Sequence, residues 1–193
     1  VFVAPRGGGG GGPAAPPPPP APVPIGQLLR ELAAPLAAVH RIQGPHAGRL
    51  AGAQHHRTWR DYLHNRLDAY ATASPELTHI AAALHQEVDA EDIDIEPRLL
   101  HHDLQPGHLV RSPNGLMLLD WELAALGDPL SDPARLTVRL DHADPTDALS
   151  LVCHQPPPGA GRRIRLYWRI HQLADAALST DPVVWHRARA RLA

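Results

Sequence analysis

Hydrophobic residues repeat at helical spacing on both sides of a short central stretch in which that spacing is lost. Before residue 90 the spacing predicts one helix from near Ile25, a second over about 56–73, and a third that opens at Ser74-Pro75. Serine followed by proline is typical of a helix N-cap and first turn. Pro35 is expected to kink or divide the first helix. After Pro129 the spacing predicts three further helices, over about 131–141, 160–178 and 182–192.

The central stretch has the pattern of a hairpin. Two short apolar runs, 109–110 and 116–119, flank the sequence Ser112-Pro113-Asn114-Gly115. An Asn-Gly step between apolar runs favours a tight turn between antiparallel strands. The sequence therefore predicts a mainly α-helical domain, a helical bundle with one small antiparallel hairpin at its middle.

The first 24 residues have a different composition. Gly7 to Gly12 form an unbroken glycine run, and proline dominates the positions that follow. Such a segment cannot bury a core and favours an extended chain. We expect residues 1–24 to form a linker and residues 25–193 to form one domain. The first residue is Val1 rather than methionine, which we interpret as the mark of a fragment.

Composition excludes several classes of protein. A hydrophobic content of 44% indicates a globular domain, and a formal net charge of −2 gives no argument for binding nucleic acid or an acidic membrane. No apolar run approaches the roughly 18 residues that a membrane-spanning helix needs. Cys153 is the single cysteine, so an internal disulfide is excluded, and we expect a cytoplasmic protein.

The residues suited to chemistry lie around the predicted hairpin. Phosphoryl transfer needs a carboxylate near the acceptor hydroxyl and metal ligands that neutralise the triphosphate. Asp103 and His108 are five positions apart, and Asp120 ends the second predicted strand. Folding at Asn114-Gly115 would return Asp120 to His108, so we expect these three side chains to converge on one site.

These segments resemble the aminoglycoside phosphotransferase family, which is related to choline and protein kinases. Residues 101–110, His-His-Asp-Leu-Gln-Pro-Gly-His-Leu-Val, resemble that family's loop His-Gly-Asp-Leu-His-Pro-Gly-Asn-x-Leu. Leu-Asp-Trp-Glu at 119–122, Gly-Asp-Pro-Leu-Ser-Asp at 127–132 and the helix ending in 36–42 resemble other family segments. The resemblance covers about residues 25–180 in order, and it implies a protein-kinase-like C-terminal lobe.

The resemblance also implies roles for the site residues. Asp103 would be the catalytic base or the carboxylate that orients the acceptor hydroxyl. Asp120 and His108 would bind Mg²⁺ together with ATP or GTP. Asp132 and His101 would support the loop.

Two further assignments are less specific. Glu122 is either a substrate contact or only a polar strand end, and both alternatives stay open. Residues 1–6, which begin Val1-Phe2-Val3, are interpreted as a remnant of the hinge strand that contacts the nucleotide base.

The chain departs from the family pattern at three points. His102 replaces a glycine, and His108 replaces an asparagine, although macrolide-kinase-type members also have Pro-Gly-His in this loop. The chain has no lysine, and its only glycine run adjoins prolines instead of lying between strands. The nucleotide-binding N-terminal lobe of a kinase needs a lysine on a strand and a glycine-rich loop between strands. We therefore expect a C-terminal lobe alone, and leave open that the N-lobe is encoded upstream.

The leading hypothesis is a small-molecule O-phosphotransferase that acts on a hydroxyl of an antibiotic-like compound or a metabolite. The alternative is a catalytically inactive, truncated kinase-like remnant or binding module. A weaker alternative is a zinc-dependent hydrolase with His101, His102, Asp103 and His108 as ligands. His102 is interpreted as exposed. A further group of histidines without close ligand spacing is interpreted as surface or helix-face residues: His55, His56, His64, His79, His85, His142, His154, His171 and His186.

Overall fold

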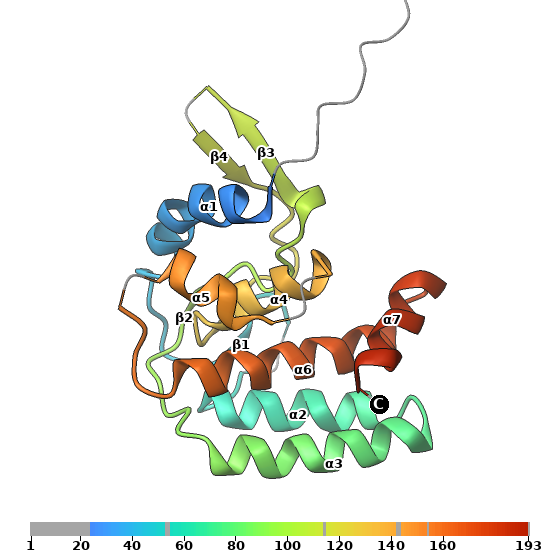
Figure 1. Cartoon of the computed structure of the whole chain (residues 1–193). Helices are drawn as coiled ribbons and strands as arrows, with labels where there is room; N and C mark the ends of the chain where they lie inside the picture. The colour runs from blue at the N-terminus through green and yellow to red at the C-terminus, as the bar shows by residue number, and fades with distance from the viewer. Residues whose placement is uncertain (1–23, 53–54, 114, 142–143, 154, 193) are drawn as a thin grey trace, which may run out of the picture.

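The computed structural model describes residues 24–52, 55–113, 115–141, 144–153 and 155–192 (Figure 1). The predicted linker over residues 1–24 and the hinge remnant over residues 1–6 lie outside this part of the chain, except for Pro24. Asn114 of the predicted turn lies outside it as well.

Within the described residues the chain forms seven helices, one 3-10 turn and two small antiparallel sheets, so the predicted mainly α fold is confirmed. The helices are α1 (Ile25–Val39), α2 (Trp59–Ala71), α3 (Pro75–Ala90), α4 (Ser131–Arg139), α5 (Thr146–Val152), α6 (Ala160–Leu178) and α7 (Pro182–Leu192), and the 3-10 turn is η1 (Pro106–His108). None of these helices is long and apolar enough to cross a membrane.

The predicted hairpin is formed by β3 (Leu109–Ser112) and β4 (Gly115–Leu118), which pair from Leu109 with Leu118 to Ser112 with Gly115. A second sheet was not predicted. It joins β1 (Gly48–Arg49), β5 (Ala125–Gly127) and β2 (Arg98–Leu100) in that order. Strands of two or three residues are too short to show an alternating pattern, so the sequence contains no clear sign of them.

Local sequence explains where the helices begin. Thr58 accepts a hydrogen bond from the backbone of Asp61, and the Asp61 side chain accepts one from the backbone of Thr58, which is a complete capping box for α2. Ser74 caps α3 with proline in its first turn, as predicted. Pro35 lies inside α1 but does not divide it.

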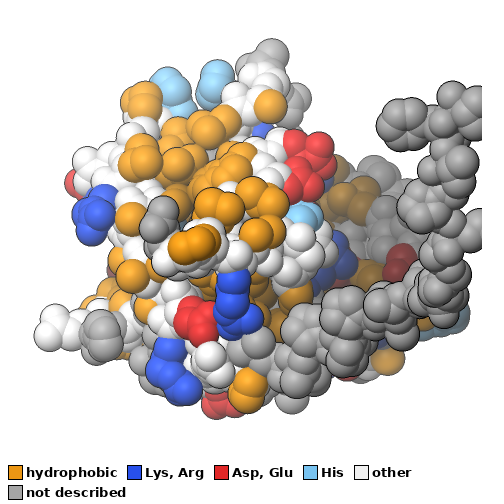
Figure 2. Space-filling model, turned by 90° about the horizontal axis from the view of Figure 1, so that it is seen from above, with side chains coloured by type: hydrophobic (Ala, Val, Ile, Leu, Met, Phe, Trp, Pro, Cys, Tyr) orange, Lys and Arg blue, Asp and Glu red, His pale blue; other side chains and the backbone are white. Residues whose placement is uncertain are grey.

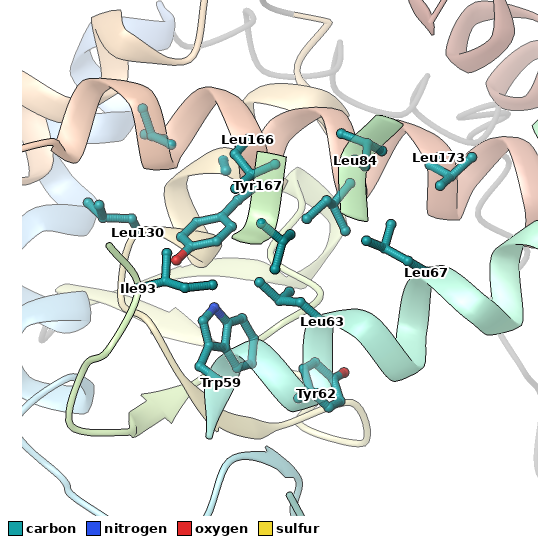
Figure 3. Packing of buried hydrophobic residues seen from close by; sticks show 14 of the residues in the cluster. Trp59, Tyr62, Leu63, Leu67, Leu84, Ile93, Leu130, Leu166, Tyr167 and Leu173 are labelled. Carbon is teal, nitrogen blue, oxygen red and sulfur yellow. The ribbon is translucent and has the colours of Figure 1, made fainter. Parts of the chain in front are cut away.

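The larger of two cores lies between α2, α3 and α6, which run side by side (Figure 1). Trp59 and Tyr167 are its largest fully buried side chains, and their rings meet edge to face with centroids 6.2 Å apart (Figure 3). Gly127 of β5 makes this packing possible, because a Cβ at that position would lie 2.3 Å from the Trp59 ring. Gly127 therefore lets β5, the strand before α4, lie directly against the first residue of α2.

A smaller core positions the segment that carries the chemistry. Leu29, Leu32 and Leu36 of α1 pack with Leu136 of α4 around Leu104, which has no exposed surface. Truncating a buried leucine of this kind costs about 2–5 kcal/mol. Leu104 therefore anchors the loop after β2 between α1 and α4, immediately beside Asp103.

Candidate active site

Asp132, at the start of α4, fixes the backbone of the loop that contains Asp103. Its Oδ2 accepts a hydrogen bond from the His101 amide at 3.0 Å, and its Oδ1 accepts one from the His102 amide at 2.8 Å. His40, directly after α1, also contacts Oδ2 at 3.0 Å. Burial acts to raise the pKa of Asp132, but the bonds from His40 and the two amides outweigh burial and lower it. A buried anion thus joins α1, the loop and α4.

His102 adopts a left-handed backbone conformation, with φ of +64°. A non-glycine residue pays a strain of roughly 1–3 kcal/mol there. The expectation that His102 is exposed was wrong: it is partly buried, and its ring lies 5.7–6.0 Å from the rings of Tyr62, His171 and Trp59. Burial is the main cause that lowers the pKa of His102 to about 4, followed by the charge of Arg49.

Asp103 is bound by Arg135 of α4, which was not predicted from the sequence as a site residue. Nε and Nη2 of Arg135 donate to Oδ1 of Asp103 at 3.1 and 3.0 Å, while Nη1 donates to Asp175 of α6 at 2.7 Å. Burial acts to raise the pKa of Asp103, but the charge and hydrogen bonds of Arg135 outweigh it, so the pKa lies below its usual value. Asp103 is therefore ionised at neutral pH.

His108 lies between the two acidic residues of the predicted site. Its Nδ1 is 2.9 Å from the Asp103 carbonyl oxygen and 4.0 Å from Asp103 Oδ2, and its Nε2 is 3.3 Å from Asp120 Oδ2. The hairpin thus brings Asp120 back to His108. Asp120 also has a positive φ of +61°, and its side chain is 47% exposed.

The hydrogen bonds around His108 indicate which atom could hold a metal. Nδ1 must donate, because its partner is a carbonyl oxygen. Gln105 Nε2 lies 3.2 Å from Asp103 Oδ2 and 2.8 Å from His108 Nε2, and it donates to both. His108 Nε2 has a single lone pair, which accepts the hydrogen bond from Gln105, so a cation held by His108 Nε2 and Asp120 Oδ2 would have to displace the Gln105 amide. Mg²⁺ usually takes one or two protein ligands and completes its shell with water and phosphate oxygens, so this pair fits it in number, although an imidazole is a poorer ligand than a carboxylate.

The other predicted site residues take different positions. His101 is buried, its Nε2 donates to the Leu119 carbonyl at 2.6 Å, and its ring lies 4.8 Å from that of Trp121. Glu122 is exposed and lines neither of the two cavities beside α2. The structure thus brings Asp103, His108 and Asp120 together and leaves Glu122 apart from them.

A cavity of about 220 Å³ opens beside Asp103, between α2, α4 and α6. Tyr62 and Arg66 of α2, Arg135 and Arg139 of α4, and His171 of α6 are among the residues that line it. His171 is buried and contacts Ser131 Oγ at 3.0 Å, so of the two alternatives, a surface or a helix-face residue, it is a helix-face residue of α6. Burial and then the charge of Arg135 lower its pKa well below the usual value.

Sequence reasoning missed Arg135, Arg139 and Asp175. Arg135 and Arg139 follow Asp132 at intervals of three and seven, which places all three on one face of α4. That spacing was visible in the sequence. Asp175 lies 40 positions after Arg135, and only the packing of α6 on α4 brings the two together.

The hairpin presents an apolar surface above the site. Val110, Met117, Leu119 and Trp121 are large hydrophobic residues that remain 37–46% exposed. Figure 2 views the molecule from the hairpin's side and shows hydrophobic side chains gathered across the centre of this face. Arg111 of β3 pairs with Glu31 of α1 at 2.6 Å, which fixes the hairpin over α1.

The APH model, described as the phosphotransferase enzyme family, matches residues 6–167. The chain belongs to this family. The resemblance to this family that the sequence indicated is therefore confirmed. The match begins at residue 6 and so includes most of the segment 1–24 that was interpreted as a linker. No curated protein sequence matches the chain.

Solved structures of related folds agree with the family assignment. A thermostable mutant of aminoglycoside phosphotransferase APH(4)-Ia in complex with ADP and hygromycin B is similar with a TM-score of 0.66 at 21% identity, over 85% of this chain and 62% of that one. Choline kinase LicA from Streptococcus pneumoniae is similar with a TM-score of 0.63 at 18% identity, over 87% of this chain and 64% of that one. The putative fructosamine-3-kinase from Haemophilus somnus 129PT is similar with a TM-score of 0.59 at 16% identity, over 89% and 65%. The chain thus shares the kinase-like fold and spans less than two thirds of the length of each of these proteins.

The geometry of the described residues does not support the hypothesis of a zinc-dependent hydrolase. Among the described residues, no group of three or more His, Cys, Asp or Glu side chains is arranged to hold a metal ion. His102, one of its four suggested ligands, instead packs among the rings of the larger core.

Proposed function

We propose that residues 25–193 form the catalytic lobe of a cytoplasmic kinase that transfers the γ-phosphate of ATP or GTP to a hydroxyl group of a small molecule. One observation carries the proposal. Asp103 lines a cavity large enough for part of a small molecule. His108 lies between Asp103 and Asp120, with Nδ1 4.0 Å from Asp103 Oδ2 and Nε2 3.3 Å from Asp120 Oδ2. An acceptor site and a metal-phosphate site are thus adjacent, as in-line phosphoryl transfer requires.

In the proposed reaction the acceptor hydroxyl lies in the cavity and donates a hydrogen bond to Asp103. Its oxygen forms a bond to the γ-phosphorus, the bond from that phosphorus to the β–γ bridging oxygen breaks, and the nucleoside diphosphate leaves. The hydroxyl proton passes to Asp103 and then to solvent. Because Arg135 keeps Asp103 a weak base, its main contribution is to orient the hydroxyl, and proton transfer occurs late, when the oxygen is already bonded to phosphorus.

Asp120 and His108 would hold Mg²⁺ in the proposed enzyme. The ion would supply positive charge to the triphosphate oxygens. The nucleotide and hygromycin B in the complex of the APH(4)-Ia mutant support a nucleotide and a small molecule as the partners here. The apolar face of the hairpin is suited to the underside of a nucleotide base, and an N-lobe encoded upstream would cover it from above.

The decisive experiment uses the protein as its host produces it, so that any N-lobe is present. Its intact mass is measured first, and Mg²⁺-dependent binding of ATP and GTP is then measured by calorimetry. The proposal expects binding of a nucleotide and its hydrolysis or transfer when hydroxylated compounds are added. If the protein from its host binds no nucleotide in the presence of Mg²⁺, the alternative hypothesis of a catalytically inactive remnant would be correct.

A further inference from the structure

The cavity beside Asp103 has more positive than negative charge on its walls. It is lined by four arginines, Arg49, Arg66, Arg135 and Arg139, and by two carboxylates, those of Asp103 and Asp175. Both carboxylates are already bound to Arg135. In the part of the chain that the structure describes, no carboxylate forms an ion pair with Arg49 or Arg66. The cavity therefore has two cationic groups without a counter-charge.

These two arginines lie where a ligand could reach both. A second cavity, of about 270 Å³, shares Arg49, Tyr62 and Arg66 with the first. Arg66 is held in place by Tyr70: its Nε donates to the phenol oxygen at 3.2 Å, and its guanidinium carbon lies 4.8 Å from the centre of the ring. A guanidinium fixed in this way loses little freedom when it binds an anion.

Several buried polar atoms of the cavity have no hydrogen-bond partner among the described residues. Arg49 Nε and Arg139 Nε are donors only, and His102 Nδ1 can donate or accept. The Tyr62 hydroxyl, in a residue 3% exposed, lies beside the Arg49 side chain and keeps its own proton to donate. Asp175 Oδ2 is the one acceptor-only atom of this kind in the lining. Because buried polar groups are normally paired, a surplus of donors indicates a ligand group that accepts hydrogen bonds.

The two histidines that line the cavity, His102 and His171, do not make it more suitable for a cationic ligand. Burial and then the charge of Arg49 lower the pKa of His102, while burial and then the charge of Arg135 lower that of His171. Both imidazoles are therefore neutral at physiological pH. The arginines disfavour additional positive charge in this space, whether on a side chain or on a ligand.

We propose that the acceptor is a hydroxylated molecule with an anionic group, a carboxylate or a phosphate, and that Arg49, Arg66 and Tyr62 bind this group while Asp103 orients the hydroxyl. The inference rests on the proposed function, because it takes this cavity as the acceptor site. An aminated acceptor would place an ammonium group beside two unpaired guanidinium groups.

The test compares three sugars of similar size and different charge. Binding of glucuronate, glucose and glucosamine to the protein as its host produces it is measured by calorimetry at pH 7.5 without nucleotide, with inorganic phosphate as a fourth probe. We expect glucuronate to bind about tenfold or more tightly than glucosamine, with glucose between them. Arg49→Gln and Arg66→Gln should each weaken glucuronate binding by about tenfold and leave glucose binding nearly unchanged. Arg165→Gln is the matched control, since it removes the same charge from an exposed position of α6 and should change neither affinity.

Two results would overturn the inference. The first is that glucosamine binds as tightly as glucuronate, or that Arg49→Gln and Arg66→Gln weaken the binding of glucosamine as much as that of glucuronate. The other is the absence of glucuronate and phosphate binding at concentrations up to about 10 mM. The nucleotide-free binding assay and the transfer assay with nucleotide together separate the two proposals. Anion binding without phosphate transfer would contradict the proposed function alone, whereas transfer to aminated acceptors in preference to anionic ones would contradict the inference alone.

Discussion

Arg135 donates two hydrogen bonds to a single carboxylate oxygen of Asp103, from Nε at 3.1 Å and from Nη2 at 3.0 Å. Oδ1 is thereby occupied on the α4 side, and Oδ2 remains for Gln105 and for an acceptor hydroxyl. The pairing also keeps Asp103 ionised in a partly buried position.

Replacing Arg135 with glutamine should raise the pKa of Asp103, because burial then acts without the opposing charge. The acid limb of the pH–rate profile should move to higher pH. The free energy of unfolding should fall by about 3 kcal/mol, since Asp103 and Asp175 both lose their partner. Rate profiles and denaturant titrations check both effects.

Arg139→Gln is the matched control for this variant. Its guanidinium lies 3.9 Å from Asp103, farther than that of Arg135, so the acid limb should move much less. An acid limb that stays in place in Arg135→Gln would show that the profile reports a group other than Asp103.

Asp103→Asn and Asp120→Asn should separate the two halves of the site. The first variant should abolish phosphotransfer and leave nucleotide affinity nearly unchanged, because Asp103 faces the acceptor cavity. The second should weaken Mg²⁺-dependent nucleotide binding itself, because Asp120 faces His108 Nε2 at 3.3 Å. Calorimetry with and without Mg²⁺ measures affinity, and a coupled nucleoside-diphosphate assay measures turnover. If Asp103→Asn kept more than about a tenth of the turnover, its assigned role would be wrong.

Gly127→Ala tests the contact that joins β5 to the larger core. The added Cβ would lie 2.3 Å from the Trp59 ring, so the variant should lose about 1–3 kcal/mol of stability. Gly161→Ala in α6 is the control, because nothing lies within 4 Å of its added Cβ, and it should gain about 0.5–1 kcal/mol. Thermal denaturation of the two variants should therefore shift in opposite directions, and a shift in the same direction would contradict the role of Gly127.

The elements that the sequence predicted are those with several turns of repeated apolar spacing. α1, α2, α3, α4, α6 and α7 are of this kind, and the hairpin was marked by its turn. The seven-residue helix α5 was not predicted. The sheet β1-β5-β2 was not predicted either, because its strands are held by partners far away in the sequence. Local pattern contains no information on such pairing.

The same division holds for the candidate site. Asp103, His108 and Asp120 were found because they lie on one loop and one hairpin, so sequence spacing fixes their arrangement. Arg49 and Asp175 reach the cavity only through tertiary packing, since one lies on a two-residue strand and the other on α6. The burial of His102 and His171 has the same origin, because each ring is covered by side chains from another element.

His102 makes stability depend on pH. The unfolded chain binds a proton at this residue below about pH 6.5, whereas the folded protein binds it only near pH 4. The unfolded state therefore holds more protons in this window, so the stabilisation is present above pH 6.5 and is lost as pH falls toward 4. Between pH 6.5 and 5 the free energy of unfolding should fall by up to about 1.4 kcal/mol per pH unit from this group, and the lowered pKa of His171 acts in the same direction.

Denaturant titrations at pH 7, 6 and 5 measure this slope. His102→Asn should reduce it, because asparagine does not titrate and tolerates the positive φ of this position. His79→Asn, which replaces an exposed histidine of α3, should leave the slope unchanged. Equal slopes in the wild type and in His102→Asn would mean that His102 takes up its proton in the folded state as readily as in the unfolded chain, and the packing of its ring against Trp59 and Tyr62 would then not be what keeps it neutral.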